Sequence, residues 1–271
     1  MSGTEFDAKM REMLSGGQAF CVATVVKTVG STLAKQGFKI LVDSQGNILA
    51  GTLGGACPEG TVAELASQCI SRRSPRLVKV FLEDAGRAVA AATVEKDDEI
   101  HVETNCGGNM EIFLDPYVGP ERLFVFTDGG KDDVASAFIK MAKLVGFEVN
   151  LVDPTETVEG ADKRTPRPEL SGLDIGEHDY AIVLTRGKTD IEVLTEVSKH
   201  KFGFVGLLAS KTRFGADIEQ LRSRGVSQEF LASIRSPLGV DIGAQTPAEI
   251  AVSILAEVVA KKRNKSVQRK T

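Results

Sequence analysis

The sequence predicts an α/β protein: a small α+β domain followed by a Rossmann-like domain built on a parallel sheet. In the first third, apolar β-branched runs follow one another closely, as antiparallel strands do. From residue 121 onward such runs alternate with segments of helical periodicity, which is typical of βαβ units. The pattern changes at PYVGP (116–120), so we assign 1–118 to the first domain, 121–262 to the second, and 263–271 to a basic tail.

The first domain is expected to begin with a short helix at 6–14. The run AFCVATVVKT is of strand length, and the turn at 43–47 joins two further strands in a hairpin. Apolar residues at helical spacing predict a helix after this hairpin. The expected elements are strands 19–28, 38–42, 48–51, 77–82 and 110–114 and helices 6–14 and 61–70.

In the second domain, the buried run LFVF is followed by an amphipathic helix and a second strand, which together form a βαβ unit. The same alternation continues to a long last helix. The expected elements are strands 123–126, 148–152, 180–184 and 204–208 and helices 134–145, 191–200, 214–224 and 247–262.

Charge and hydropathy exclude several classes of function. The formal net charge of -4 argues against nucleic acid as a partner, because phosphate contacts need a basic face. The basic residues after Lys261 lack apolar spacing and are typical of a solvated tail. The first residues lack the apolar core of a signal peptide, and no apolar run has membrane-spanning length, so we expect a cytoplasmic protein without a membrane span.

The chain has four cysteines and three histidines. Without an export signal the cysteines are expected to be reduced thiols. None forms a C-x-x-C pair and the histidines are scattered, so any metal site would consist mainly of thiolates. Cys21 and Cys69 lie on apolar faces and are predicted to be core residues.

The segment GGACPEG (54–60) follows a strand and precedes a helix. Gly54 and Gly55 allow the backbone to fold closely around a ligand, and Pro58 suits the first helical position, which places Cys57 near the N-cap. The positive end of a helix lowers a thiol pKa and binds anions. The alternative is a tight turn with a small buried cysteine.

A second thiol, Cys106, stands beside Gly107 and Gly108. Glycines next to a thiol leave it accessible to a ligand or a metal. We predict that Cys57 and Cys106 line one solvent-reachable pocket, with Glu59 beside them, and that this pocket binds a cofactor or metal.

The second domain lacks an intact dinucleotide fingerprint. The turn TDGGKDD (127–133) contains Gly129 and Gly130, but only one of the three required glycines is in place. Asp132 stands where the third glycine should be and brings negative charge to the pyrophosphate position, whereas Asp153 occupies the ribose-binding position. NAD is therefore expected to bind poorly, and a Rossmann-shaped scaffold without a dinucleotide is the alternative. A nucleotide held there would contact Asp153 without the usual glycine cradle.

Four segments resemble the XdhC/CoxI family: ATVVKTVGS (23–31), GTLGGACPEG (51–60), CGGNMEIFLDP (106–116) and PLGVDIGAQTPAEIAVSILAEVVA (237–260). The resemblance implies an accessory factor for a molybdenum hydroxylase such as xanthine dehydrogenase or carbon monoxide dehydrogenase. Such a factor would bind molybdenum cofactor, as molybdopterin or its cytosine dinucleotide, shield it during sulfuration and pass it to the apoenzyme. A sulfurtransferase and a second copy of the chain, forming a homodimer, are further partners that the resemblance suggests.

The chain departs from the family pattern in its second domain. Family members usually carry G-x-G-H-x-G where this chain has 127–132, and a histidine pair where it has LTRGK (184–188). The segment VGLLASKTR (205–213) also differs at a glycine. Both cysteine motifs persist, which suggests the carbon monoxide dehydrogenase branch and makes Cu(I), a soft ion, a candidate ligand of Cys57 and Cys106.

Three functions follow from these observations. A non-catalytic maturation chaperone is favoured over a dinucleotide-dependent oxidoreductase, because the chain lacks an intact pyrophosphate turn and a clear acid or base beside it. A thiol-based copper or sulfur carrier for the same client is the third. If the protein performs chemistry, Cys57 and Glu59 are the residues expected to carry it.

Overall fold

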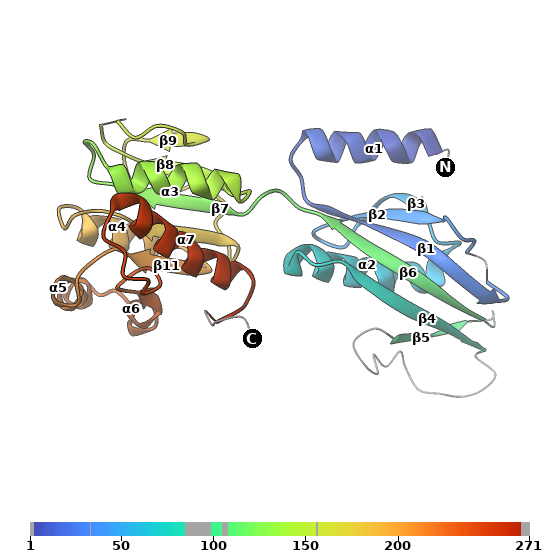
Figure 1. Ribbon diagram of the computed structural model, residues 1–271. Coiled ribbons are helices and arrows are strands. Elements are labelled where there is room, and N and C mark those ends of the chain that lie inside the picture. The colour runs from blue at the N-terminus through green and yellow to red at the C-terminus, as the bar shows by residue number, and fades with distance from the viewer. Residues whose placement is uncertain (1–2, 33, 85–98, 105–107, 156, 267–271) are drawn as a thin grey trace. The chain divides into compact units, whose positions relative to one another are not determined.

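The computed structural model describes the chain except for residues 1–2, 33, 85–98, 105–107, 156 and 267–271. It consists of two compact units, Met1–Gly119 and Pro120–Thr271, which are described separately below (Figure 1). The division between Gly119 and Pro120 falls inside the segment where the composition changes.

The first unit is built on a six-stranded sheet in the order β3-β2-β1-β6-β4-β5. Neighbouring strands of this sheet pair antiparallel, except that β4 and β5 are parallel. The strands are β1 (Phe20–Gly30), β2 (Lys39–Asp43), β3 (Ile48–Thr52), β4 (Arg76–Asp84), β5 (Glu99–Thr104) and β6 (Gly108–Tyr117). The predicted hairpin of β2 and β3 is confirmed.

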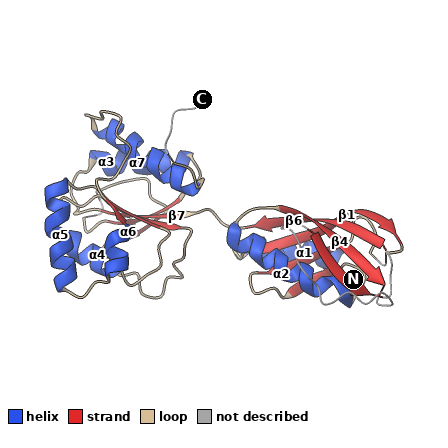
Figure 2. Cartoon of the chain, turned by 90° about the horizontal axis from the view of Figure 1, so that it is seen from below, coloured by secondary structure: helices blue, strands red, loops and turns tan. Residues whose placement is uncertain are grey.

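Two helices cover this sheet (Figures 1 and 2). The helix α2 (Ala56–Arg72) packs its apolar side on the main core, to which β1 contributes Cys21, Ala23 and Val25. The helix α1 (Gly3–Ser15) packs by way of Met13 in a smaller cluster on the other side of β1. Period-two alternation thus sends successive β1 side chains to different cores.

The elements of this unit are longer than expected. The strand predicted at 110–114 runs from Gly108 to Tyr117, because it pairs along its length with β1. The helix predicted from residue 61 begins at Ala56. The strand β5 was not predicted.

The second unit is a wholly parallel six-stranded sheet in the order β12-β11-β10-β7-β8-β9, which confirms the Rossmann-like fold class. The strands are β7 (Arg122–Phe126), β8 (Glu148–Val152), β9 (Lys163–Thr165), β10 (Asp179–Val183), β11 (Phe204–Leu207) and β12 (Ile234–Arg235). The strand order reverses between β7 and β10, and ligands of such folds bind at the carboxyl ends of the strands at this point.

Helices cover both faces of the parallel sheet (Figure 2). They are α3 (Asp133–Leu144), α4 (Asp190–Val197), α5 (Lys211–Ser223), α6 (Gln228–Ser233) and α7 (Pro247–Lys262). The helices α3 and α7 share one apolar core, and α4, α5 and α6 share the other. The short elements β9, α6 and β12 were not predicted. None of the helices in the described ranges is long and apolar enough to cross a membrane.

Candidate functional site

The loop between β3 and α2 in the first unit is organised by one carboxylate. The Oε1 atom of Glu59 accepts hydrogen bonds from the Thr52 hydroxyl (2.6 Å) and from the Leu53 and Gly55 N–H groups (2.7 and 3.2 Å). The Thr52 hydroxyl oxygen in turn accepts from the Gly54 N–H at 3.0 Å. The loop is therefore held in a fixed shape from within its own sequence.

The end of this loop is an uncapped helix N-terminus. Gly54 and Gly55 have φ angles of 98° and 126°, a region that favours glycine. Gly55 is the N-cap of α2 and supplies no side-chain cap, and its own N–H donates to Glu59. Because Pro58 has no N–H, Ala56 and Cys57 carry the N–H groups of the first turn that would face an anion. Cys57 is the second helical residue and Pro58 the third, so the prediction that Pro58 opens the helix was wrong by two positions.

Part of the predicted thiol pocket lies outside the described residues. This holds for Cys106 and Gly107 entirely and for the side chain of Cys57, so the proposed Cys57–Cys106 pair stays a prediction. Gly108 has a structural role, because a Cβ atom there would lie 2.7 Å from the carbonyl oxygen of Val29. It lets β6 approach β1, which is a different role from the predicted opening of space around a thiol.

The two remaining cysteines are core residues, as predicted. Cys21 and Cys69 are at most 1% exposed and belong to the core beneath α2. Burial, helped by the nearby Cys69 and Asp115, raises the pKa of the Cys21 thiol to about 12. Cys21 is therefore protonated and unreactive at neutral pH.

In the second unit, the turn after β7 is filled by side chains of the protein. The Asp132 carboxylate caps α3 by accepting from the Ala135 N–H at 2.9 Å. The Gly130 N–H donates to the Thr155 hydroxyl at 2.7 Å. A Cβ atom on Gly129 would lie 2.6 Å from Thr155 Cγ2, so Thr155 rests directly on this turn. The Gly130 and Ala135 N–H groups, which would face a pyrophosphate in a dinucleotide site, thus donate to side chains of the protein itself.

Asp153, at the ribose-binding position, is also engaged. It is 1% exposed and its two oxygens accept four hydrogen bonds, from the N–H and hydroxyl of Thr155 and from the N–H groups of Thr157 and Val158. Burial raises the pKa of this carboxyl, but the hydrogen bonds outweigh burial and leave the pKa below its ordinary value. Asp153 shapes the loop after β8.

The switch point itself is bridged by polar contacts. Asp128, after β7, accepts hydrogen bonds from the Arg186 N–H and from the Thr189 hydroxyl, both at 2.6 Å. The Arg186 guanidinium donates to the Lys131 carbonyl at 2.8 Å and lies 3.6 Å from the Asp132 carboxylate. These contacts join the loops after β7 and β10. Sequence reasoning did not single out Asp128 or Thr189, although Asp128 lies directly before Gly129 in the turn after the first strand of this domain.

A buried charge cluster lies behind this bridge. Asp190 accepts from the Thr185 hydroxyl, and its Oδ2 atom is 3.1 Å from the Arg213 Nε. Asp217, one turn along α5 from Arg213, is 7% exposed. Burial, together with the charge of Asp190 and a hydrogen bond to it, raises the pKa of Asp217 to about 6, against the opposing effect of Arg213. Sequence reasoning missed this pair.

No group of three or more histidine, cysteine, aspartate or glutamate side chains in the described ranges is placed to hold a metal ion. The side chain of Cys57 and the whole of Cys106 lie outside those ranges, so the predicted thiolate site stays a prediction.

Comparison with known proteins identifies the two units. Residues 13–80 match the model of the XdhC and CoxI family, and residues 125–258 match that of the XdhC Rossmann domain. The chain is 31% identical over 257 residues to the Escherichia coli protein YqeB, described as uncharacterized, covering 90% of this chain and 44% of that protein. It is 27% identical over 160 residues to a probable xanthine dehydrogenase subunit of Bacillus subtilis, covering 55% and 46%.

The chain therefore spans less than half the length of these two curated relatives. A solved structure described as a xanthine dehydrogenase from Bacillus halodurans is 20% identical, with a TM-score of 0.46 and 96% of each chain covered. With a family model matching each of its two units, the chain belongs to the XdhC/CoxI family.

Proposed function

We propose that this protein assists the maturation of a molybdenum hydroxylase of the xanthine dehydrogenase type by binding molybdenum cofactor at the β3–α2 loop. The observation that carries the proposal is the uncapped α2 N-terminus, held open by Gly54 and Gly55 and shaped by Glu59. Family membership and the name of the Bacillus subtilis relative support the choice of client.

The residues of the loop suit the cofactor chemically. Molybdenum cofactor carries a phosphate, and backbone N–H groups at a helix N-terminus bind phosphate. Among the residues that the structure describes, no atom lies within 4 Å of where a Cβ atom on Gly55 would be. Cys57, in the first turn of α2, would supply a thiol beside the bound group. When bound, the cofactor would bring the molybdenum and sulfur that the client needs, while this chain holds and shields it.

The oxidoreductase alternative finds less support. A hydride-transfer enzyme needs a pyrophosphate turn with free donors, and here Thr155 takes the Gly130 N–H while Asp132 caps α3. A copper or sulfur carrier would use the same Cys57 and differs only in its cargo.

The test measures what the full chain carries when it is purified anaerobically from cells that make the cofactor. Molybdenum and copper are measured by mass spectrometry and the pterin by its fluorescence after oxidation. We expect molybdenum and pterin together in the wild type and a several-fold loss in Cys57→Ser and Glu59→Gln. Glu64→Gln, on the exposed side of the same helix, is the matched control and should retain the wild-type amounts of molybdenum and pterin.

If Cys57→Ser and Glu59→Gln both contained as much molybdenum as the wild type, this loop would not be the binding site. Copper without pterin, lost on Cys57→Ser, would replace the proposal with the carrier function. Alkylation of the native protein should label Cys57 and spare Cys21 and Cys69, because the latter two are buried.

A further inference from the structure

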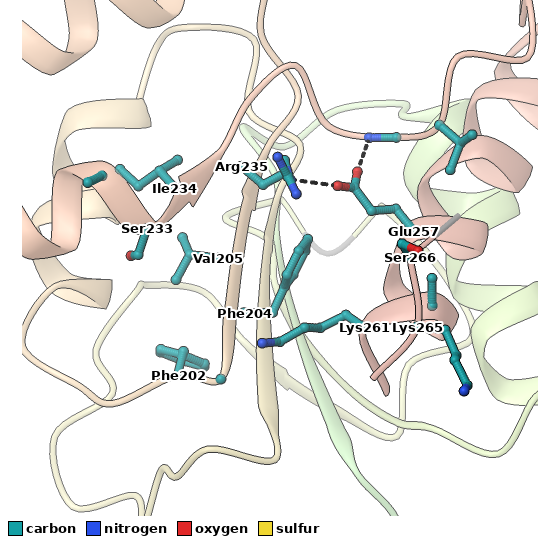
Figure 3. A pocket seen from close by; sticks show the side chains of 15 residues that line it. Phe202, Phe204, Val205, Ser233, Ile234, Arg235, Glu257, Lys261, Lys265 and Ser266 are labelled. Carbon is teal, nitrogen blue, oxygen red and sulfur yellow. Dashed lines mark hydrogen bonds and ion pairs between the residues drawn. The ribbon is translucent and has the colours of Figure 1, made fainter. Parts of the chain in front are cut away.

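The second unit contains a pocket of about 660 Å3 at the amino end of β11 (Figure 3). The loops after β7 and β10 lie at the opposite, carboxyl end of the parallel sheet. It lies between β11, the short strand β12 and the last turns of α7. Pockets that hold small molecules have volumes of about 300 to 1,000 Å3. The size of this pocket therefore fits a small organic ligand.

Part of the lining of the pocket is apolar. Phe202, Phe204 and Val205 line it from the start of β11, and Ile234 lines it from β12. In Figure 3 the Phe204 side chain lies on the same side of β11 as Lys261, whereas Phe202 and Val205 lie on the other side. The Phe204 ring offers a flat surface on which a planar group can stack.

The opposite wall is fixed by a half-buried carboxylate. Glu257 of α7 accepts a hydrogen bond from the Gly239 N–H at 2.7 Å and lies 2.8 Å from the Nε of Arg235 (Figure 3). The Glu257 side chain is 15% exposed. These contacts tie β12 and the segment that follows it to α7, so the pocket is formed before any ligand binds. Arg235 and Glu257 also neutralise each other's charge.

The other charged residues that line the pocket, Lys261 and Lys265, are positive. Lys261 extends from α7 toward Phe204, as Figure 3 shows. Its neighbour Lys262 is engaged elsewhere, 2.6 Å from Glu121 and 4.4 Å from the centre of the Phe147 ring. Within the described part of the chain no acidic side chain forms an ion pair with Lys261. A lysine in the last turn stabilises a helix end, but this does not require it to extend toward Phe204.

We propose that this pocket binds a small organic anion with a flat apolar part, with the anionic group at Lys261 and the flat part against Phe204. The site is independent of the β3–α2 loop, so its failure would leave the proposed function unaffected.

The probe is anilinonaphthalene sulfonate, an aromatic anion whose fluorescence rises on binding, titrated into the full chain. We expect saturable binding that weakens about tenfold in Lys261→Gln, as the loss of one charged contact implies. Lys140→Gln, at an exposed lysine of α3, is the matched control and should bind normally. Ser233→Trp, at an exposed lining position, should fill the pocket and abolish binding with an unchanged circular dichroism spectrum.

Competition then distinguishes the ligand class. Displacement of the probe by naphthoate indicates an aromatic carboxylate, and displacement by adenosine monophosphate indicates a nucleoside phosphate. Inorganic phosphate should not compete, because it lacks the apolar part. Equal affinity in Lys261→Gln and Lys140→Gln, unchanged binding in Ser233→Trp, displacement by phosphate alone, or failure of both organic anions to compete would each overturn the proposal.

Discussion

The buried pair of Asp190 and Asp217 makes the stability of the second unit depend on pH. Burial and the neighbouring Asp190 raise the pKa of Asp217 from its ordinary 3.8 to about 6. The folded protein therefore binds this proton more tightly than the unfolded chain does. This contribution to stability is complete at low pH and is lost as pH rises from about 4 to about 6.

The size of the effect follows from the two pKa values. The difference between 3.8 and about 6 corresponds to about 3 kcal/mol, of which about 2 kcal/mol falls between pH 4.5 and 7.5. Asp217→Asn removes the titration while keeping a hydrogen-bonding side chain of similar shape. As the pH rises from 4.5 to 7.5, the free energy of unfolding of the variant should therefore increase by about 2 kcal/mol relative to that of the wild type.

The measurement is urea unfolding at several pH values. The chain has no tryptophan, so Phe230→Trp, at a half-buried position in the core of α4, α5 and α6, gives a fluorescence signal from the second unit alone. Glu219→Gln, on the same helix as Asp217 but exposed, is the control and should follow the wild type. If the free energy of unfolding changed with pH in the same way in the wild type and in Asp217→Asn, the reasoning would be refuted.

Two further predictions concern backbone geometry and the turn after β7. Gly51→Ala should cost about 3 kcal/mol or more in urea unfolding, because at φ 89° its Cβ atom would lie 2.0 Å from the Lys39 carbonyl oxygen. Gly46→Ala, at φ 85° with no contact closer than 3.8 Å, carries only the backbone strain of about 1 kcal/mol, and equal losses in the two variants would contradict the argument. Calorimetry should find no binding of NAD at micromolar concentration, because the Asp132 carboxylate accepts from the Ala135 N–H and the Gly130 N–H donates to Thr155. A dissociation constant in the low micromolar range would disprove this.

Periodicity was sufficient to predict the main elements of both units. The β7–α3–β8 unit has an uninterrupted apolar strand and a helix with a buried stripe, so sequence and structure agree within two residues. The two-residue β12 could not be predicted in the same way, because so short a segment gives no periodic signal of its own. The strand β5 was missed although its sequence EIHVET alternates polar and apolar residues, as a strand does.

The site was predictable to a lesser degree. Gly54, Gly55 and Glu59 were singled out from their place between a strand and a helix, and the structure joins them in one loop. Asp217 was missed because its environment comes from a turn of α5 packed beside Asp190, about thirty residues away in sequence. A pKa perturbation depends on tertiary contacts that composition and spacing do not encode.

The internal use of the turn after β7 has a consequence for how the second unit responds to ligands. A domain gains stability from a ligand only by binding the folded form, in proportion to the logarithm of ligand concentration over the dissociation constant. Here Thr155 and Asp132 already hold the backbone groups that a nucleotide would otherwise hold. We therefore expect added nucleotide to leave the melting temperature of this unit unchanged, so that its stability would not depend on the nucleotide supply.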